Sequence, residues 1–268
     1  MLGRVLSDAI KGLRRGKAQA AAANPLAEYY FNNPGRLIHK WHHYFDIYHR
    51  HFEAFRHRSP VVVEVGVFHG GSLEMWRKYF GPGARIVGID VDPRCRQFEG
   101  DSINILIGDQ ADRNFLGQVR ALVPHVDIVI DDGGHTMEQQ ITTFEELYPH
   151  VQPHGVYLCE DLHTSYRPGW GGGSGRPGTF VALAKRQIDL LNAWHSEEPG
   201  VLDVTEVTRS TQSIHFYDSV VVFEKRSRTP HTQVHAGFPS FGPGARVPGA
   251  WSRAASQLAR LYDRMRGR

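Results

Sequence analysis

Two short acidic runs are the residues of this chain best suited to chemistry. Asp131 and Asp132 precede a glycine pair and His135, and Glu160 and Asp161 form a second run further along. Each run directly follows an apolar stretch typical of a buried strand. In an open parallel sheet, residues beyond the carboxyl ends of neighbouring strands meet in one crevice, so these acids are expected to face one another. Their mutual repulsion favours a bound hard divalent cation such as Mg2+, unless they are ordinary solvated loop acids.

A glycine-rich loop precedes these acids in the chain. A run of valines leads through Glu64 to Gly66, and Gly70, Gly71 and Ser72 then open a pattern typical of a helix. Glycine allows a backbone to approach a ligand closely. The spacing E-x-G-x-x-x-G-G differs from the dinucleotide pattern G-x-G-x-x-G, so the loop alone does not identify its ligand.

Two more predicted strands end in polar side chains. The stretch 85–90 ends in Asp90, at the position where a carboxylate can hold the diol of a ribose. The stretch 103–107 leads into Asp109 and Gln110. Together with the glycine loop, these strand ends suit a small zwitterion, a ribose and the edge of an adenine.

The order of these motifs resembles a known family. The runs VVVEVGVFHGGS, IVGIDVD, IGDQAD, IVIDDGGH and GVYLCEDLHTSY are similar to those of class I S-adenosylmethionine-dependent methyltransferases. More narrowly, they resemble the metal-dependent sugar O-methyltransferases of macrolide tailoring and of mycobacterial saccharide biosynthesis. The similarity covers residues 35–225 and is most specific in the GDQ, DDG-x-H and EDL-x-TSY pieces.

The resemblance implies a fold, two cofactors and a set of site residues. The fold is an α/β, Rossmann-like sheet, mostly parallel with an antiparallel closing strand and with helices on both faces. The cofactors are S-adenosylmethionine and Mg2+. Asp132, Glu160 and Asp161 are the implied metal ligands, and His135 is the implied general base. The implied cofactor-binding residues are Glu64, Gly66, Gly70, Ser72, Asp90, Asp109, Gln110 and Asp131.

The molecule that would accept the methyl group is less closely defined than the methyl transfer itself. The resemblance favours a hydroxyl of a sugar or oligosaccharide, in a glycosylated natural product or a polysaccharide precursor. His163 stands where the macrolide enzymes are expected to carry Gln, which leaves the substrate contacts around it open. A catechol-type acceptor would use the same cation, and a binding protein that has kept the fold without activity is a third interpretation.

Composition narrows the possible partners and compartments. The 268 residues carry a formal net charge of +3 and only two cysteines, and 41% of them are hydrophobic. We find no basic stripe with interleaved aromatic residues, which argues against a nucleic-acid partner. No apolar run is long enough to span a membrane, and no signal peptide is recognisable. We therefore expect a cytoplasmic protein.

The chain is expected to divide into three parts. Residues 1–34 form an N-terminal extension, in which 1–23 is compatible with a basic amphipathic or oligomer-contacting helix. Residues 35–226 form the methyltransferase domain. Residues 227–268 form a Pro/Gly-rich linker and a basic helix, and this tail is expected to contribute to a homo-oligomer.

Within the domain, three segments carry further expectations. An amphipathic helix is predicted over 37–55, with five histidines that lack an accompanying carboxylate or cysteine and so read as polar-face or substrate-entrance residues. The glycine-rich segment 166–179 is predicted to be a lid that closes over substrate, with an exposed linker as the alternative. Closing strands are predicted over 204–209 and 213–224, with a tight turn at Asp218 and Ser219.

Overall fold

The structure is a computed structural model that describes residues 24–237, 239, 241, 257–258 and 261–262. The chain divides into two units, 1–229 and 230–268. In the second unit, residues 230–236 form no regular element, and 257–258 and 261–262 are helical. The helix predicted over 1–23 and most of the tail helix lie outside the described residues.

The first unit is built on a seven-stranded sheet with the order β3-β2-β1-β4-β5-β7-β6. All neighbours among β1 to β5 pair in parallel, and β7 pairs antiparallel with both β5 and β6. The predicted parallel sheet with an antiparallel closing strand is confirmed. The strands are β1 (Val61–Val65), β2 (Arg85–Asp90), β3 (Ile103–Ile107), β4 (Val126–Asp131), β5 (Val151–Cys159), β6 (Thr211–Tyr217) and β7 (Val220–Lys225).

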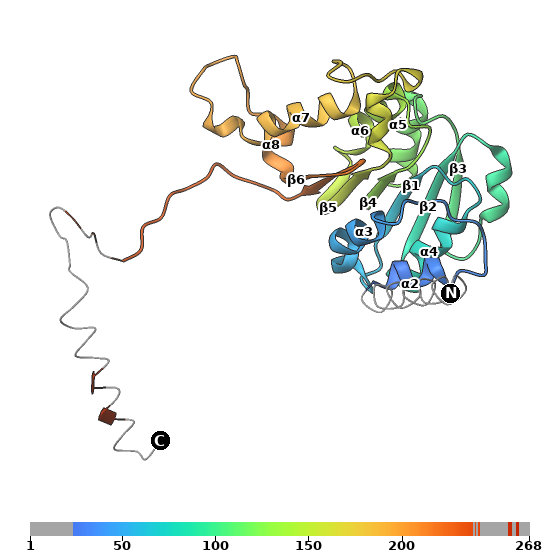
Figure 1. Ribbon diagram of the computed structural model, residues 1–268, viewed down its shortest axis with the longest axis horizontal. Coiled ribbons are helices and arrows are strands. Elements are labelled where there is room, and N and C mark those ends of the chain that lie inside the picture. Colours follow the sequence, from blue (N-terminus) through green and yellow to red (C-terminus); the bar gives the residue numbers. More distant parts are fainter. Residues whose placement is uncertain (1–23, 238, 240, 242–256, 259–260, 263–268) are drawn as a thin grey trace, which may run out of the picture. The chain divides into compact units, whose positions relative to one another are not determined.

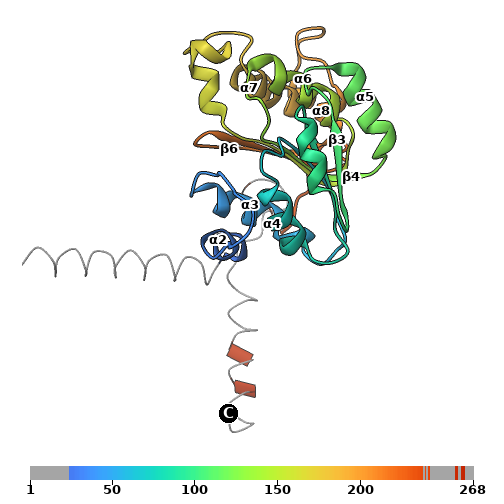
Figure 2. The ribbon, with the colours of Figure 1, turned by 90° about the vertical axis from the view of Figure 1, so that its right-hand side faces the viewer.

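Helices cover both faces of the sheet, as Figures 1 and 2 show. Helices α2 (Pro25–Phe31), α3 (Tyr44–Phe52) and α4 (Gly71–Phe80) lie on one face, and α5 (Arg113–Leu122), α6 (Met137–Leu147) and α7 (Phe180–Leu191) on the other. An apolar core lies on each face of the sheet, and successive side chains of a strand point into one core and then the other. In β1, Val62 belongs to the first core and Val63 to the second. This alternation follows from the two-residue period of a strand.

Two predicted elements differ from the observed ones. The helix expected over 37–55 begins only at Tyr44, and a 3-10 turn over Glu53–Phe55 follows its end at Phe52. Residues 37–40 form no regular element, and they carry Lys40 into the site described below. The stretch expected as a strand over 204–209 is mostly helical, as α8 (Glu206–Ser210), because Thr205 and Thr208 form a capping box.

The tight turn predicted between the closing strands is confirmed. β6 and β7 form a hairpin whose two connecting residues are Asp218 and Ser219. The segment 166–179 contains only the end of a 3-10 turn, Leu162–Tyr166, and a second such turn, Pro168–Trp170. Within the described residues, no helix is long and apolar enough to cross a membrane.

Candidate functional site

Two adjoining cavities open at the carboxyl ends of the parallel strands. The larger, of about 430 Å³, runs from the glycine loop past Asp90 to Gln110. The smaller, of about 220 Å³, lies between the loop, Lys40 and the acids that follow β4 and β5. Gly66 and Asp132 line both cavities, so the two spaces meet there. The predicted crevice at this sheet edge is therefore present.

Gly66 has a backbone conformation that few other residues adopt. Its φ is +94°, and a Cβ built on it would lie 2.0 Å from the carbonyl oxygen of Asp132. The tight approach joins the glycine loop after β1 to the acidic loop after β4. Gly66 therefore shapes the wall between the cavities as well as leaving room for a ligand.

Asp90 combines two roles at the end of β2. Its Oδ2 accepts hydrogen bonds from the backbone amides of Val67 and Phe68, at 2.9 and 3.0 Å, and its Oδ1 accepts from the amide of Asp92. The carboxylate therefore holds the glycine loop in shape. Because Asp90 also lines the larger cavity, it remains placed for the ribose contact predicted from the sequence.

The polar residues near the predicted adenine end divide into two groups. Gln110 lines the larger cavity, but its side-chain amide is already bonded to Asp131, Thr143 and the amide of Gly134. Asp109 is exposed and caps a turn through the amide of Ala111, and it does not line either cavity.

Asp131 is buried and lines neither cavity. It accepts hydrogen bonds from Gln110 at 3.0 Å and from the Tyr157 hydroxyl at 3.1 Å. Burial raises the pKa of Asp131 to about 7, although these hydrogen bonds act to lower it. The position indicates a carboxyl group that braces the end of β4, and its predicted contact with cofactor stays a prediction.

Glu64 and Ser72 form a buried pair at the start of α4. The Ser72 hydroxyl donates to Glu64 at 2.8 Å, and the Trp76 indole donates to it at 2.9 Å. Burial raises the pKa of Glu64 to about 7. Ser72 lines the smaller cavity and Glu64 lies behind it, while Gly70 faces the ring of Phe98.

Asp132, His135 and Asp161 form a compact group at the smaller cavity. One ligand atom from each lies within 4.8 Å of the other two. The His135 Nε2 atom is 3.4 Å from Asp161 Oδ2 and 3.8 Å from Asp132 Oδ1. His135 and Asp161 both have positive φ, at +59° and +54°, which is uncommon outside glycine.

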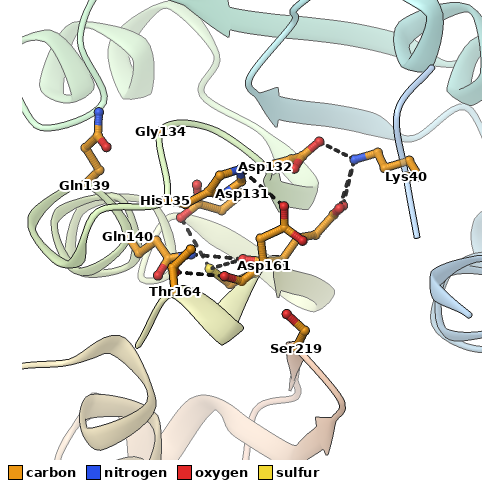
Figure 3. Close-up of polar contacts among 12 residues, drawn as sticks. Lys40, Asp131, Asp132, Gly134, His135, Gln139, Gln140, Asp161, Thr164 and Ser219 are labelled. Carbon is orange, nitrogen blue, oxygen red and sulfur yellow. Dashed lines mark hydrogen bonds and ion pairs between the residues drawn. The ribbon is translucent and has the colours of Figure 1, made fainter. Parts of the chain in front are cut away.

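Lys40 is the residue of this site that the sequence did not reveal. Figure 3 shows its ammonium reaching the acids from the segment before α3. Its Nζ lies 2.5 Å from Asp132 Oδ2 and 3.0 Å from both carboxylate oxygens of Glu160. Glu64 lies 3.9 Å away on another side. The sequence offered one hint of this role. Lys40 is one of only six lysines in an arginine-rich chain, and it lies in an aromatic segment that was expected to pack on the sheet.

Carboxyl groups surround the Lys40 ammonium on several sides. Burial alone would lower the pKa of Lys40, but the neighbouring Asp132, Glu160 and Glu64 raise it, so Lys40 is an ammonium ion. Burial and repulsion from Asp132 still raise the pKa of Glu160, even though Lys40 acts to lower it. The carboxylate oxygens of Asp132 and Asp161 are a ligand type that suits a divalent cation.

Only two of the three metal ligands predicted from the sequence face each other. Asp132 and Asp161 face one another with His135, whereas both oxygens of Glu160 face Lys40. Glu160 stays a predicted ligand, and it is joined to the group through the Lys40 contact with Asp132.

Aromatic side chains form a wall on the outer side of the acids. The Tyr44 hydroxyl donates to Asp161 Oδ1 at 2.7 Å. Trp41 stacks on the ring of His163 at 4.8 Å, and His163 is bonded to the Ser219 hydroxyl in the β6–β7 turn. From the predicted lid, the half-exposed Trp170 faces His135 at 6.2 Å. These rings lie close to Asp161 and His135.

Comparison with known proteins agrees with this architecture. Residues 63–162 match a family model described as a methyltransferase domain. An 8-demethyl-8-alpha-L-rhamnosyl tetracenomycin-C 2'-O-methyltransferase from Streptomyces olivaceus is 35% identical, over 72% of this chain and 53% of its own length. Demethylmacrocin O-methyltransferase from Streptomyces fradiae is 36% identical, over 70% of this chain and 51% of its own length.

A solved structure shares the fold. The MycE methyltransferase from the mycinamycin biosynthetic pathway, in complex with Mg, SAH and mycinamycin VI, superposes with a TM-score of 0.66 at 33% identity. The match covers 76% of this chain and 53% of that one. This chain thus spans about half the length of the relatives it matches. Residues 63–162 thus match a methyltransferase domain, the Rossmann-like fold is shared with MycE, and the resemblance to the sugar O-methyltransferases of antibiotic tailoring is confirmed.

Proposed function

We propose that this protein is a metal-dependent O-methyltransferase that transfers a methyl group from S-adenosylmethionine to a hydroxyl of a sugar or oligosaccharide. The acceptor would belong to a glycosylated natural product or a polysaccharide precursor. The observation that carries the proposal is the group of Asp132, His135 and Asp161 at the junction of two cavities. The tetracenomycin relative, which is named as a 2'-O-methyltransferase of a rhamnosyl compound, supports the choice of acceptor.

The larger cavity would hold the cofactor. Asp90 and Gln110 line its two ends, and Gly66 lies where it meets the smaller cavity. The sulfonium of S-adenosylmethionine would lie near this junction, so its methyl group would face the smaller cavity. The chain's task is to align the acceptor oxygen with that methyl group, an orientation effect worth several kcal/mol.

Asp132 and Asp161 would hold Mg2+, with Glu160 as the predicted third ligand. When bound, the ion would favour the deprotonated form of the acceptor hydroxyl and fix its position. Carboxylate oxygens are the ligands that Mg2+ prefers. Lys40 would keep Glu160 and Asp132 oriented, and Tyr44 would do the same for Asp161.

His135 would take the proton of the acceptor hydroxyl. Its Nε2 faces the acids, and among the described residues its buried Nδ1 has no hydrogen-bond partner. A base within hydrogen-bond reach typically contributes about 10²- to 10⁴-fold to the rate. The same geometry would allow His135 to act as a ligand instead, and the two roles are separated experimentally below.

Trp41, His163 and Trp170 would form the acceptor wall. Binding sites for small molecules combine aromatic surfaces with a few placed polar groups, and this wall beside the acids has that character. The lid segment 166–179 would bring Trp170 over the bound sugar and exclude water from the reacting oxygen. A homo-oligomer stays a prediction for the whole protein.

The test has two stages. Calorimetry should show S-adenosylmethionine binding, and no binding of nicotinamide dinucleotides. A screen with tritium-labelled methyl groups should then cover rhamnosides, other glycosides, oligosaccharides and catechols, in the presence of Mg2+. Labelled sugar ethers are the expected product. Labelling of catechols alone would replace the sugar proposal, and cofactor binding with no transfer to any acceptor class would favour a binding protein.

A further inference from the structure

A second group of metal-ligand side chains lies away from the candidate active site. His51 belongs to the histidine-rich segment of α3, which showed no accompanying carboxylate in the sequence. In the structure, the hairpin brings His215 of β6 and Glu224 of β7 against it. One ligand atom from each of the three residues lies within 4.8 Å of the other two.

The register of the hairpin explains why these residues meet. Ser213 pairs with Glu224, and His215 pairs with Val222, so the side chains of Ser213, His215 and Glu224 share one face. Helix α3 packs on that face, with Tyr44 at one end bonded to Asp161 and His51 at the other. Because Glu224 pairs with Val156, near the start of the parallel part of β5, this group is remote from the acids that follow Cys159.

The distances approach those of a tetrahedral site. His51 Nδ1 lies 2.7 Å from Glu224 Oε1, and His215 Nε2 lies 3.5 Å from Glu224 Oε2. Ligand atoms at the usual 2.0–2.1 Å from Zn2+ in a tetrahedron are about 3.3 Å apart. Small rotations of the Glu224 and His215 side chains would therefore suffice. Two imidazoles and one carboxylate form a ligand set that suits Zn2+ better than Mg2+.

The protonation states also suit a divalent metal. Burial lowers the pKa of His51, although its contact with Glu224 acts to raise it. Burial alone would raise the pKa of Glu224, but hydrogen bonds from Ser213 and His51 bring it below its usual value. These directions favour the neutral form of His51 and the ionised form of Glu224, which are the forms that bind metal.

Hydrogen-bond partners contact the proposed ligand side chains. The Tyr217 hydroxyl lies 2.9 Å from His51 Nε2, and the Ser213 hydroxyl donates to Glu224 at 2.7 Å. The Ser213 hydroxyl also lies 3.0 Å from His215 Nε2, and zinc would replace that contact when it binds this nitrogen. Tyr217 can donate to Nε2 or accept from it. When a metal replaces the Nδ1 proton of His51, that proton can move to Nε2 and bond to Tyr217. Such an outer partner is typical of metal-bound histidines.

Access to this group is from one side. The His51 side chain is only 1% exposed, whereas those of His215 and Glu224 are 36% and 35% exposed. A cavity of about 560 Å³ adjoins His51 and Glu224 and leaves room for a water as fourth ligand.

We propose that His51, His215 and Glu224 form a zinc site that ties α3 to the β6–β7 hairpin. Zinc would bridge the helix that carries Tyr44 and the hairpin that carries Ser219, and so would stiffen two elements that border the candidate active site. The proposal does not depend on the methyltransferase activity, because it concerns other residues and a different metal.

The test is zinc titration of the full-length protein after chelator treatment and dialysis. An Asp161→Asn background removes one ligand of the group at the smaller cavity, and variants of the second group are compared within that background. We expect one equivalent of Zn2+ by calorimetry and a higher unfolding midpoint with zinc. Loss of an outer partner costs about 10- to 100-fold in metal affinity. His215→Gln, which removes a ligand, should weaken zinc binding by more than about 100-fold, and Tyr217→Phe by less.

His125→Gln is the matched control. His125 also contacts a carboxylate, Asp127, at 3.0 Å, but it has no place in the group formed by His51, His215 and Glu224. Zinc binding in this variant should equal that of the background. Absence of zinc binding in the background, or equal binding in His215→Gln, would overturn the proposal. Because His215 and Glu224 are partly exposed, His215→Gln and Glu224→Gln are expected to fold.

Discussion

The ammonium of Lys40 lies 3.0 Å from both carboxylate oxygens of Glu160 and thereby joins the segment before α3 to the end of β5. The same ammonium contacts Asp132 and lies 3.9 Å from Glu64. One buried cation thus links the loop after β4, the end of β5 and the acid behind the glycine loop. The candidate metal site and the candidate cofactor site share this link.

Lys40→Met should destabilise the protein strongly. Removal of one partner from a buried ion pair leaves an unpaired charge, which typically costs about 3–5 kcal/mol. Urea unfolding in the presence of chelator measures the change. Lys40→Arg keeps the charge and should lose less. A loss below about 1 kcal/mol in Lys40→Met would show that Glu160 does not depend on this cation.

Alkylation of Cys95 should depend on pH, because the ionisation of its thiol is perturbed. Burial, together with the nearby Asp90, raises the pKa of the Cys95 thiol to about 11 from an ordinary 9.0. The thiolate fraction at pH 8 is then about 100-fold smaller than for a free thiol, and alkylation should rise about tenfold per pH unit through pH 10. A plateau near pH 9 would contradict the raised pKa.

The same labelling tests the cofactor assignment. Because Cys95 lines the larger cavity, S-adenosylhomocysteine should slow its alkylation. Labelled sites are identified by mass spectrometry, with Cys95→Ser as the blank. Cys159, which is fully buried, should stay unlabelled in either condition. Unchanged labelling of Cys95 at saturating S-adenosylhomocysteine would place the cofactor elsewhere.

His135→Asn separates base catalysis from metal ligation. Asn tolerates the positive φ of this position better than Ala, so the loop should keep its shape. If His135 is the base, the turnover number should fall by about 10²- to 10⁴-fold with little change in metal affinity. A large loss of Mn2+ affinity, measured by electron paramagnetic resonance, would instead make His135 a ligand.

His163→Asn is the comparison for that variant. His163 lies 3.9 Å from Asp161 and stacks on Trp41, so it belongs to the proposed acceptor wall. Its loss should raise KM for the acceptor more than it lowers kcat. Equal loss of kcat in both variants would argue against a special role for His135.

Gly66→Ala should destabilise the fold as well as weaken cofactor binding. A Cβ at this position meets the Asp132 carbonyl oxygen at 2.0 Å, and the backbone has φ +94°. Overpacking and strain together cost about 3 kcal/mol. Gly169→Ala, where a Cβ meets nothing within 4 Å, should change stability by less than about 0.5 kcal/mol. Similar thermal midpoints for the two variants would contradict this account.

The sheet was predictable from the sequence because its signals are local. Apolar runs such as Val61–Val65 end in glycine or an acid, and each marks a buried strand and its carboxyl end. The start of α3 was less predictable, because aromatic residues before Tyr44 continue the apolar pattern although they do not form the helix. The stretch before β6 was misjudged because its β-branched residues, Val204, Thr205 and Val207, favour a strand, while the capping box at Thr205 begins a helix.

The site was predictable where its residues follow strands and unpredictable where they come from other elements. Asp132, His135 and Asp161 meet as expected, because parallel strands bring their carboxyl ends to one edge. Lys40 and Tyr44 reach the acids from a segment far away in the sequence, and no local pattern shows that contact. The pairing of His51 with Glu224 was hidden for the same reason.

Methyl transfer to a glycoside by chelator-treated protein, measured before and after the return of Mg2+, tests the central claim most directly. The account predicts that transfer to the sugar hydroxyl is lost on chelation and restored by Mg2+, and that Asp161→Asn remains inactive in both conditions while it still binds S-adenosylmethionine. Full transfer by thoroughly chelated protein, or normal turnover of Asp161→Asn, would contradict it.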